Sequence, residues 1–461
     1  MSDLKLTPLE KFDKVLQGWS TMGGRKAIDL FAGPGGLSLG LVQSGFEVVG
    51  AVEWDKAASR TYAYNLGNHV FQQDIEEFPP QKMEEALIEN GSINSKNEID
   101  LISGGPPCPA FSLMGRSKIS NLIKSGKWEG SDHRHSFIDD PRVKLFVNFV
   151  DYVNHFNPRI FIMENVSGMN SFKEESKGKV KPIIDVIKSE FNRIGYSVKS
   201  LTLNAAEYGV PQNRKRVIFL GWKPDHVEPN FPQPVEYSIS SRDAIHDLPY
   251  ISPIDGSTLL GNQKSLPRKG SHPDDFIRWC RQTKAPKSPS KGPLLHHTRA
   301  VNPRDQAIFP ILRSGESSKR VLYKDVQMSA VRKNLPLGYR LREFKTVPNR
   351  VEGPKWGRQK RTKWKFYNQK KFGDKMRRIR GDQPSPTIVA HLAKDGYMFV
   401  HPDENRTISV REAARFQSFP DSYDFSAGGQ NSITDQFRQI GNAVPPIFAK
   451  AIGTELMKIF E

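Results

Sequence analysis

Two side chains able to do covalent or acid–base chemistry each follow a short apolar run in this sequence. The first is Cys108, which stands in the glycine- and proline-rich segment 103–112, directly after the apolar run 99–102. A β-branched run that meets glycines and prolines predicts a strand followed by a rigid loop, and open α/β sheets hold reacting groups beyond the carboxyl ends of their strands. We therefore predict that Cys108 is a nucleophile. The alternative from its residue type alone is a buried structural cysteine.

The second is Glu164, which follows the predicted strand 159–163. A carboxylic acid at the end of a strand next to the thiol could donate a proton to a ring nitrogen. Further along the chain, two arginines and a glutamine alternate with other residues before another apolar run. Strand alternation sends Gln212, Arg214 and Arg216 to one side, which an ordinary surface turn would not need.

The start of the chain predicts a pocket for a nucleoside. A strand at 26–31 leads through the glycine-rich turn 32–36 into an apolar helix at 37–44. Glycines allow close backbone approach to a ligand, and the start of a helix offers N–H groups. The next two predicted strands, 47–52 and 69–73, end in acids suited to ribose hydroxyls and in an aromatic residue suited to adenine, namely Glu53, Trp54 and Asp74. This pattern alone is equally compatible with a dinucleotide-binding enzyme.

Composition narrows the class of protein. The chain has 461 residues, enough for two or three domains, and only two cysteines, too few for a disulfide framework or a four-cysteine zinc site. We find no apolar run of about 20 residues and no signal peptide at the N-terminus. A reducing, intracellular setting without a membrane fits best.

The net charge of +18 predicts a polyanionic partner. Between residues 340 and 380 there are 16 Lys or Arg and three acids, so this basic stretch carries 16 − 3 = +13. Six aromatic residues are interleaved there, a mixture suited to phosphate contacts and base stacking. The alternative is a solvated basic face or a disordered tail, although disordered segments are usually poor in aromatic residues.

Taken together, these motifs resemble the bacterial-type DNA (cytosine-5)-methyltransferase family. The motifs span residues 27–446, nearly the whole chain, and occur in the order usual for that family. They are Asp29-Leu-Phe-Ala-Gly-Pro-Gly-Gly36, Gly105-Pro-Pro-Cys-Pro109, Glu164-Asn-Val166, Gln212-Asn-Arg-Lys-Arg216, Gln383-Pro-Ser-Pro-Thr387 and Gly441-Asn-Ala-Val-Pro-Pro446.

The resemblance implies an α/β fold with a doubly wound, mostly parallel sheet, the class I S-adenosylmethionine-dependent methyltransferase fold, and a second, smaller DNA-recognition domain. It also implies S-adenosylmethionine as cosubstrate and no metal. The residues that would hold the cosubstrate are Phe31, Gly33 and Gly35 at its methionine part, Glu53 at the ribose, Trp54 and Asp74 at the adenine, and Asn442 with Ala443 closing the pocket.

For the chemistry, the resemblance implies that the Cys108 thiolate attacks C6 of cytosine while Glu164 engages N3. Arg216 would lie near the thiolate and the base carbonyl, where a cation lowers the pKa of a thiol. Arg214 and Gln212 would brace that group. Because C5 cannot be reached inside a duplex, the base must be flipped out.

We predict a catalytic domain and a target recognition domain that holds the basic stretch, with the segment 115–140 as a closing loop beside the thiol. The boundaries are 1–222 for the catalytic domain, 223–405 for target recognition, 406–437 for a hinge and 438–461 for a C-terminal helix that returns to the catalytic domain. The expected partners are double-stranded DNA and a cognate restriction endonuclease, with the protein a monomer in the bacterial cytoplasm, at the nucleoid.

Other readings remain open. A tRNA cytosine-5 methyltransferase shares the catalytic motifs but typically carries Cys-Phe-Thr shortly after Pro-Pro-Cys, where this chain has Pro109-Ala-Phe-Ser112. Methylation of an amino group needs no thiol, and an aromatic residue would follow Pro-Pro in place of Cys108. A catalytically silent DNA-binding homologue would need a defect invisible in the sequence. A nicotinamide oxidoreductase would leave the basic stretch without a purpose.

Overall fold

The computed structural model describes two compact units of the chain. Its described residues are 24–107, 144–171, 173–176, 179–252, 271–284, 286, 295–301, 308–318, 346–347, 350–352, 363–364, 376–394 and 396–461. Cys108, the segment 115–140 and most of the basic stretch 340–380 therefore lie outside the described residues. The first unit comprises Met1–Tyr208, Arg214–Glu236 and Ala443–Glu461, and the second comprises Gly209–Asn213 and Tyr237–Asn442.

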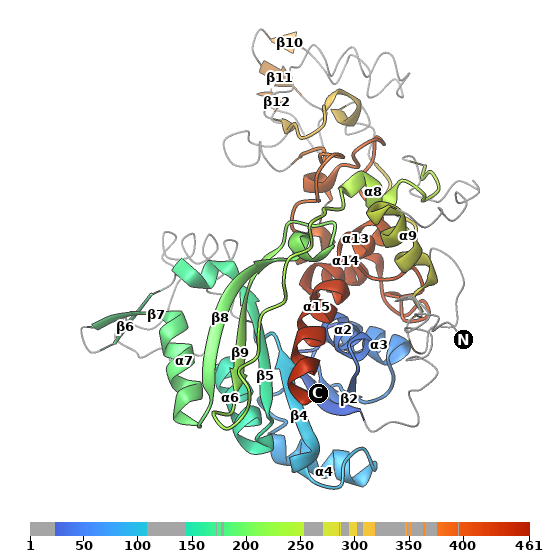
Figure 1. Cartoon of the computed structure of the whole chain (residues 1–461). Coiled ribbons are helices and arrows are strands. Elements are labelled where there is room, and N and C mark those ends of the chain that lie inside the picture. Colours follow the sequence, from blue (N-terminus) through green and yellow to red (C-terminus); the bar gives the residue numbers. More distant parts are fainter. Residues whose placement is uncertain are drawn as a thin grey trace, which may run out of the picture. The chain divides into compact units, whose positions relative to one another are not determined.

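A seven-stranded sheet forms the centre of the first unit, with the strand order β3-β2-β1-β4-β5-β9-β8 (Figure 1). The first five strands in this order are parallel to one another. The sixth strand, β9, runs antiparallel to both of its neighbours, β5 and β8. Order reverses between β1 and β4, so the carboxyl ends of these strands flank the crevice where open α/β sheets bind ligands. The strands are β1 (Arg25–Leu30), β2 (Phe46–Val52), β3 (Val70–Phe71), β4 (Ile99–Gly104), β5 (Ile160–Val166), β8 (Ser197–Asn204) and β9 (Lys215–Trp222).

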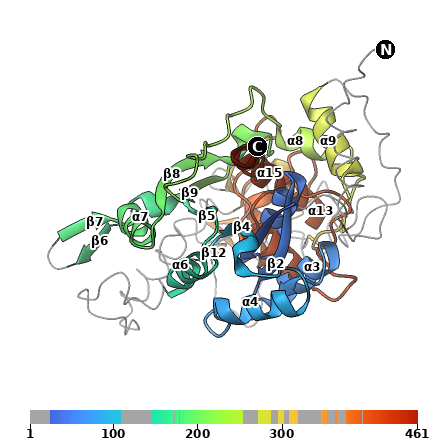
Figure 2. The same ribbon diagram turned by 60° about the horizontal axis from the view of Figure 1, so that its bottom comes forward.

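Helices cover both faces of this sheet (Figure 2). One face packs against α4 (Pro80–Glu89), α6 (Lys144–Phe156) and α7 (Ile183–Arg193), whose apolar side chains form one buried core with those of the strands. On the other face α2 (Gly36–Gln43) packs closely against α15 (Pro446–Met457). Gly40 allows this approach, because a Cβ at this position would lie only 2.4 Å from that of Ala449. The antiparallel strands β6 (Lys173–Ser176) and β7 (Lys179–Pro182) precede α7, and α3 (Lys56–Asn65) joins β2 to β3.

The predicted fold class, a doubly wound and mostly parallel α/β sheet, is confirmed. The predicted strands agree with the structure apart from their ends, and two differences matter. β3 has two residues where the apolar pattern predicted five, and β5 continues to Val166, so Glu164 lies within the strand. Pairing with β9 extends β5 beyond the apolar residues, because Glu164 and Asn165 are opposite Ile218 and Val217.

The second unit is built around short helices joined by buried polar side chains. Its helices include α8 (Ser241–Ile245), α9 (His272–Gln282), α13 (Val410–Phe416) and α14 (Ile433–Asn442), and its described strands are β10 (Thr346–Val347), β11 (Arg350–Glu352) and β12 (Lys363–Trp364). The compact units divide the chain at residues other than the three boundaries between our four predicted segments, since α14 belongs to the second unit and α15 to the first. The functional division stays a prediction.

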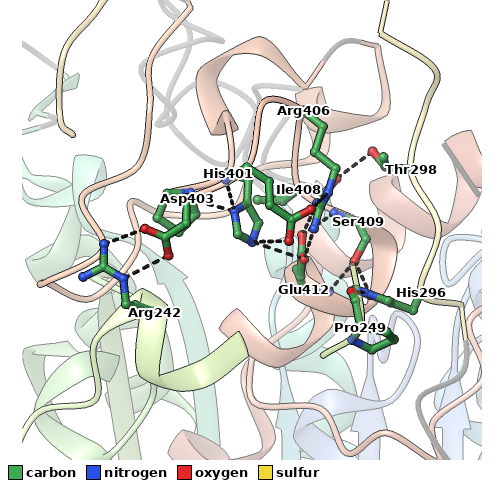
Figure 3. Close-up of polar contacts among 12 residues, drawn as sticks. Arg242, Pro249, His296, Thr298, His401, Asp403, Arg406, Ile408, Ser409 and Glu412 are labelled. Carbon is green, nitrogen blue, oxygen red and sulfur yellow. Dashed lines mark hydrogen bonds and ion pairs between the residues drawn. The ribbon is translucent and has the colours of Figure 1, made fainter. Parts of the chain in front are cut away.

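An ion pair and a capping box hold α13 in place (Figure 3). Ser409 accepts a hydrogen bond from the backbone N–H of Glu412, and the Glu412 carboxylate accepts one from the N–H of Ser409. The same carboxylate receives two bonds from the buried guanidinium of Arg406, at 2.6 and 2.8 Å. His296 also contacts Ser409, with Nδ1 and Oγ 3.1 Å apart, so this histidine has a packing role.

Two arginines of the basic stretch are already engaged within the second unit. Arg378 is buried and donates to the backbone oxygens of Phe309, Leu312 and Glu404, among others. Arg380 is paired with Asp382 at 2.8 Å. The sequence count of 16 cations therefore includes a guanidinium that stabilises the fold. Among the described residues, no helix is both long and apolar enough to cross a membrane.

Candidate active site

The turn after β1, residues 31–35, is the first part of the site, and we call it the cofactor turn. Phe31, Gly33 and Gly35 all have backbone φ angles in the left-handed region, at 57°, 57° and 93°. A Cβ placed on Gly33 would meet nothing within 4 Å, so space is open beside the turn. Gly35 is the N-cap of α2 and brings no side chain to it, which leaves the start of this helix suited to an anionic group.

Acidic side chains follow the next two strands, as predicted. Glu53 is only 7% exposed, and its carboxylate accepts hydrogen bonds from the N–H groups of Gly33 and Asp55 at 2.8 and 2.7 Å. Burial raises its pKa to about 7. A carboxylate has about four lone-pair sites, so Glu53 can also accept from ribose hydroxyls. Trp54 is 71% exposed, and Asp74 accepts a bond from Glu76 N–H.

A buried carboxyl group below the cofactor turn was missed by our sequence predictions. Asp29, in β1, accepts hydrogen bonds from the hydroxyl groups of Ser38 and Ser103, at 2.6 and 3.1 Å. Burial raises its pKa to about 7, with Glu53 adding to the effect. The indications in the sequence were a single acid among the apolar residues at the end of this strand and its place at the start of the first family motif.

Glu164 and Arg216 form an ion pair across the neighbouring strands β5 and β9. Glu164 Oε1 lies 2.7 Å from Arg216 Nε, and the two side chains are 12% and 13% exposed. The structure therefore brings together the predicted acid and the predicted arginine. Antiparallel pairing makes this contact, because the register places Val166 opposite Arg216.

The beginning of the segment that leads to Cys108 lies against this ion pair. A Cβ on Gly105 would be 3.2 Å from Glu164 Oε2, so the backbone approaches the carboxylate closely. Asn165 Nδ2 donates to the carbonyl of Pro106 at 3.0 Å, and this connects β5 to the same segment. Pro107, the last residue of this segment that the structure describes, is one residue before the predicted nucleophile.

The other two residues of the arginine motif differ in their surroundings. Arg214 is buried, and its pKa is held well below the usual range by burial and by the charge of Arg216, with Glu164 acting in the opposite direction. Gln212 makes its hydrogen bonds elsewhere, within the second unit. Its amide donates to Phe416 O and Gln417 Oε1, and its oxygen accepts from Ile388 N–H. The bracing role of both residues stays a prediction.

The last two predicted cofactor residues lie where the chain passes from one unit to the other. Asn442 ends α14 in the second unit, whereas Ala443 is buried and begins the final segment of the first unit. Their closing role stays a prediction. Within the described part of the chain, no cluster of three or more His, Cys, Asp or Glu side chains could hold a metal ion.

The strand order, the antiparallel β9 and the cofactor turn define a class I S-adenosylmethionine-dependent methyltransferase fold. Residues 25–458 match the family model of the C-5 cytosine-specific DNA methylases, and the chain belongs to this family. It is thus a DNA (cytosine-5)-methyltransferase family enzyme, and the family implies S-adenosylmethionine as cosubstrate and DNA as substrate.

Bacterial relatives match over almost their whole length. The type II methyltransferase M.AgeI of Thalassovita gelatinovora is 32% identical, with 94% of this chain and 99% of the relative covered. The type II methyltransferase M.DdeI of Desulfomicrobium norvegicum is also 32% identical, with 94% and 89% covered. A solved E. coli structure, described as a prophage-encoded DNA modification methyltransferase, is similar in fold, with a TM-score of 0.62 and 23% identity over 94% and 99% of the two chains.

Proposed function

We propose that this protein is the modification enzyme of a type II restriction–modification system. It would transfer a methyl group from S-adenosylmethionine to C5 of a flipped cytosine within one specific duplex sequence. The observation that supports this proposal best is the Glu164–Arg216 ion pair, 2.7 Å long, against which Gly105 and Pro106 lie just before Cys108. The two relatives described above, named type II methyltransferases, support the biological setting.

The reaction would proceed through a bond between Cys108 Sγ and C6 of the base. Glu164 supplies a proton to N3, so that the electron pair released by thiolate attack makes C5 nucleophilic. When bound, S-adenosylmethionine would supply an electrophilic methyl group to C5, with its sulfur–methyl bond broken and S-adenosylhomocysteine as the leaving group. C5 then loses its proton to a base, the C5–C6 double bond forms again, the thiolate leaves, and N3 returns its proton to Glu164. Arg216 orients the Glu164 carboxyl group and supplies positive charge beside the thiolate and the base carbonyl.

For the cosubstrate we propose the residues around the cofactor turn. Phe31, Gly33 and Gly35 would surround its methionine part, and Glu53 would accept from the ribose hydroxyls. Trp54, whose ring is exposed, would stack on the adenine with Asp74 beside it. Asn442 and Ala443 would close the pocket. Both the left-handed turn and the open space at Gly33 fit a ligand that approaches the backbone closely.

DNA would be bound as a duplex, with residues 223–405 reading the target and the basic stretch 340–380 contacting phosphates. We expect a monomer that acts at the bacterial nucleoid in the cytoplasm. A cognate restriction endonuclease would act on the same DNA sequence. A tRNA substrate and a catalytically silent DNA binder are the alternatives that the experiment must separate.

Nucleoside mass spectrometry tests the proposal. The purified protein and S-adenosylmethionine are incubated with unmethylated genomic DNA or with tRNA, beside a Cys108→Ser variant. We expect 5-methylcytosine in DNA only, absent with the variant, and bisulfite sequencing should place it at one recurring sequence. Methylation of tRNA would favour the tRNA methyltransferase instead. Methylation scattered over many DNA sequences would contradict a modification enzyme, and no product on either substrate would favour the catalytically silent DNA binder.

A further inference from the structure

A continuous chain of hydrogen bonds runs below the cofactor turn of the first unit. Ser38 Oγ donates to Asp29 Oδ2 at 2.6 Å, and Tyr62 OH donates to Ser38 Oγ at 2.9 Å. His69 Nε2 lies 2.9 Å from the Tyr62 oxygen. Because Tyr62 has one hydroxyl proton and gives it to Ser38, His69 must be the donor in the last bond. We call this chain from His69 through Tyr62 and Ser38 to Asp29 the relay. All of its donors point toward the Asp29 carboxylate.

Asp29 and Ser38 stand on the two sides of the cofactor turn. Asp29 is in β1, and Ser38 is in the first turn of α2. Their bond therefore holds together the two elements that the turn connects. The Asp29 carboxylate also accepts from the backbone N–H of Ser38. It thus takes the part of a capping side chain, which the N-cap residue Gly35 cannot provide.

The outer members of the relay, Tyr62 and His69, have no predicted role of their own in binding. Tyr62 is fully buried in α3, and its ring makes an edge contact with the imidazole of the half-buried His69, with 5.3 Å between the ring centroids. The buried hydrogen bond from Tyr62 in α3 to Ser38 in α2 fixes the rotamer of Ser38. Rotation of Ser38 would leave the Tyr62 hydroxyl without its acceptor and the Asp29 carboxylate without one of its donors.

We propose that Tyr62 and His69 are positioning residues for S-adenosylmethionine binding, which hold Ser38 and Asp29 in the arrangement that shapes the cofactor turn. This inference rests on the proposed function, because it takes the turn as the binding site of S-adenosylmethionine. Neither residue would touch the cosubstrate, so each acts through the relay.

The relay also predicts a pH dependence of binding. The ionised carboxylate accepts the bonds from Ser38 and Ser103, whereas protonation would turn one of its acceptor sites into a donor. The other groups facing Asp29 are the hydroxyls of Ser38 and Ser103, Tyr62 and, at the end of β2, the acid Glu53. Burial raises the pKa of Asp29 to about 7. We expect the loss of a donor from the relay to raise the pKa of Asp29 further, so binding of S-adenosylmethionine should be lost at a higher pH than in the wild type.

Calorimetric titration of the full chain with S-adenosylmethionine, without DNA, tests the relay between pH 6 and pH 9. Tyr62→Phe removes only the hydroxyl, and His69→Leu removes the outer donor. We expect each to weaken binding by about three- to tenfold near neutral pH, the equivalent of one hydrogen bond. The pH midpoint of binding should also move upward. His69→Gln keeps an N–H donor and should bind within about twofold of the wild type.

Tyr152→Phe is the matched control. Tyr152 is another buried tyrosine of the first unit, and its hydroxyl donates to the carbonyl of Phe78 at 2.6 Å, apart from the relay. It should lose melting temperature as Tyr62→Phe does but keep wild-type affinity and pH midpoint. Wild-type affinity and midpoint in Tyr62→Phe or His69→Leu would overturn the relay. If the wild-type protein itself bound no S-adenosylmethionine, the proposed function would fail instead.

Discussion

At the scale of single residues, the Glu164–Arg216 pair carries the chemistry that we propose. Glu164→Gln keeps the shape of the side chain and an oxygen that can accept from Arg216, but it removes the acidic proton. We expect single-turnover methyl transfer to fall by about 10²-fold or more, as is usual when a general acid is lost. Affinity for S-adenosylmethionine should be unchanged, since Glu164 does not contact the cofactor turn in the proposed arrangement.

Glu190→Gln is the control for this change. Glu190 forms a 3.0 Å pair with Arg193 on α7, so the same carboxyl group becomes the same amide at a distance from the site. Its transfer rate should equal that of the wild type. A Glu164→Gln variant that transfers methyl groups at the wild-type rate would remove Glu164 from the proposed mechanism.

At the scale of elements, the stability of α13 depends on one buried carboxylate. Glu412 pairs with Arg406 at 2.6 Å and also caps the helix through Ser409. Glu412→Gln removes one of the two carboxylates that pair with the buried Arg406 guanidinium and leaves Glu404, 2.8 Å from Arg406 Nε, so we expect the free energy of unfolding of the second unit to fall by about 2 kcal/mol. Denaturant titration measures this loss. Asp382→Asn, which breaks only the exposed pair with Arg380, should cause no detectable change.

The same carboxylate predicts the response of the second unit to acid. Burial alone would raise the pKa of Glu412, but Arg406 and His401 hold it well below its ordinary value of 4.5. A carboxyl group with a lowered pKa in the folded state contributes stability above its ordinary pKa and loses that contribution as the pH falls through the lowered one. The wild type should therefore lose stability below about pH 4.5 more steeply than Glu412→Gln. Parallel acid titrations of the two proteins would contradict this.

At the scale of the whole molecule, net charge should dominate affinity for DNA. The chain carries +18, of which the basic stretch 340–380 supplies +13. Counterion release makes the logarithm of the association constant fall linearly with the logarithm of salt concentration, by about 0.9 per phosphate contacted. We expect binding to a non-cognate duplex to weaken by about 10³-fold or more between roughly 50 and 200 mM salt, as for proteins with six or more phosphate contacts. Fluorescence anisotropy measures it.

Two charge-matched triple variants locate the phosphate contacts. One variant carries Lys360→Gln, Arg361→Gln and Lys363→Gln. The slope of its salt dependence should be smaller by up to the equivalent of about three phosphate contacts. The other variant carries Lys82→Gln, Lys188→Gln and Arg193→Gln in the first unit. It loses the same net charge, but its slope should equal that of the wild type. Equal slopes in the two variants would show that the basic stretch does not contact phosphates.

Much of this protein can be read from local sequence. Apolar runs punctuated by glycine, proline and acids predicted the strands of the sheet and its fold class, and the motifs, together with their order, placed the chain in its family. These features depend on residues adjacent in the chain, because backbone conformation and strand burial follow from short patterns of apolar and turn residues. The positions of Glu53 and Glu164 near the carboxyl ends of their strands, and of Arg216 just before an apolar run, were predictable for the same reason.

The tertiary structure decided what depends on residues far apart in the chain. It extended β5 past its apolar residues, because β9 pairs with Glu164 and Asn165. It buried Arg378, which by sequence is one more cation of the basic stretch, among backbone carbonyls. It also connected Asp29 to His69 through two hydroxyl groups from different helices. The sequence by itself determined the family and the elements of the sheet, whereas only folding selected the hydrogen-bond partner of each buried polar group, since burial makes an unpaired one costly.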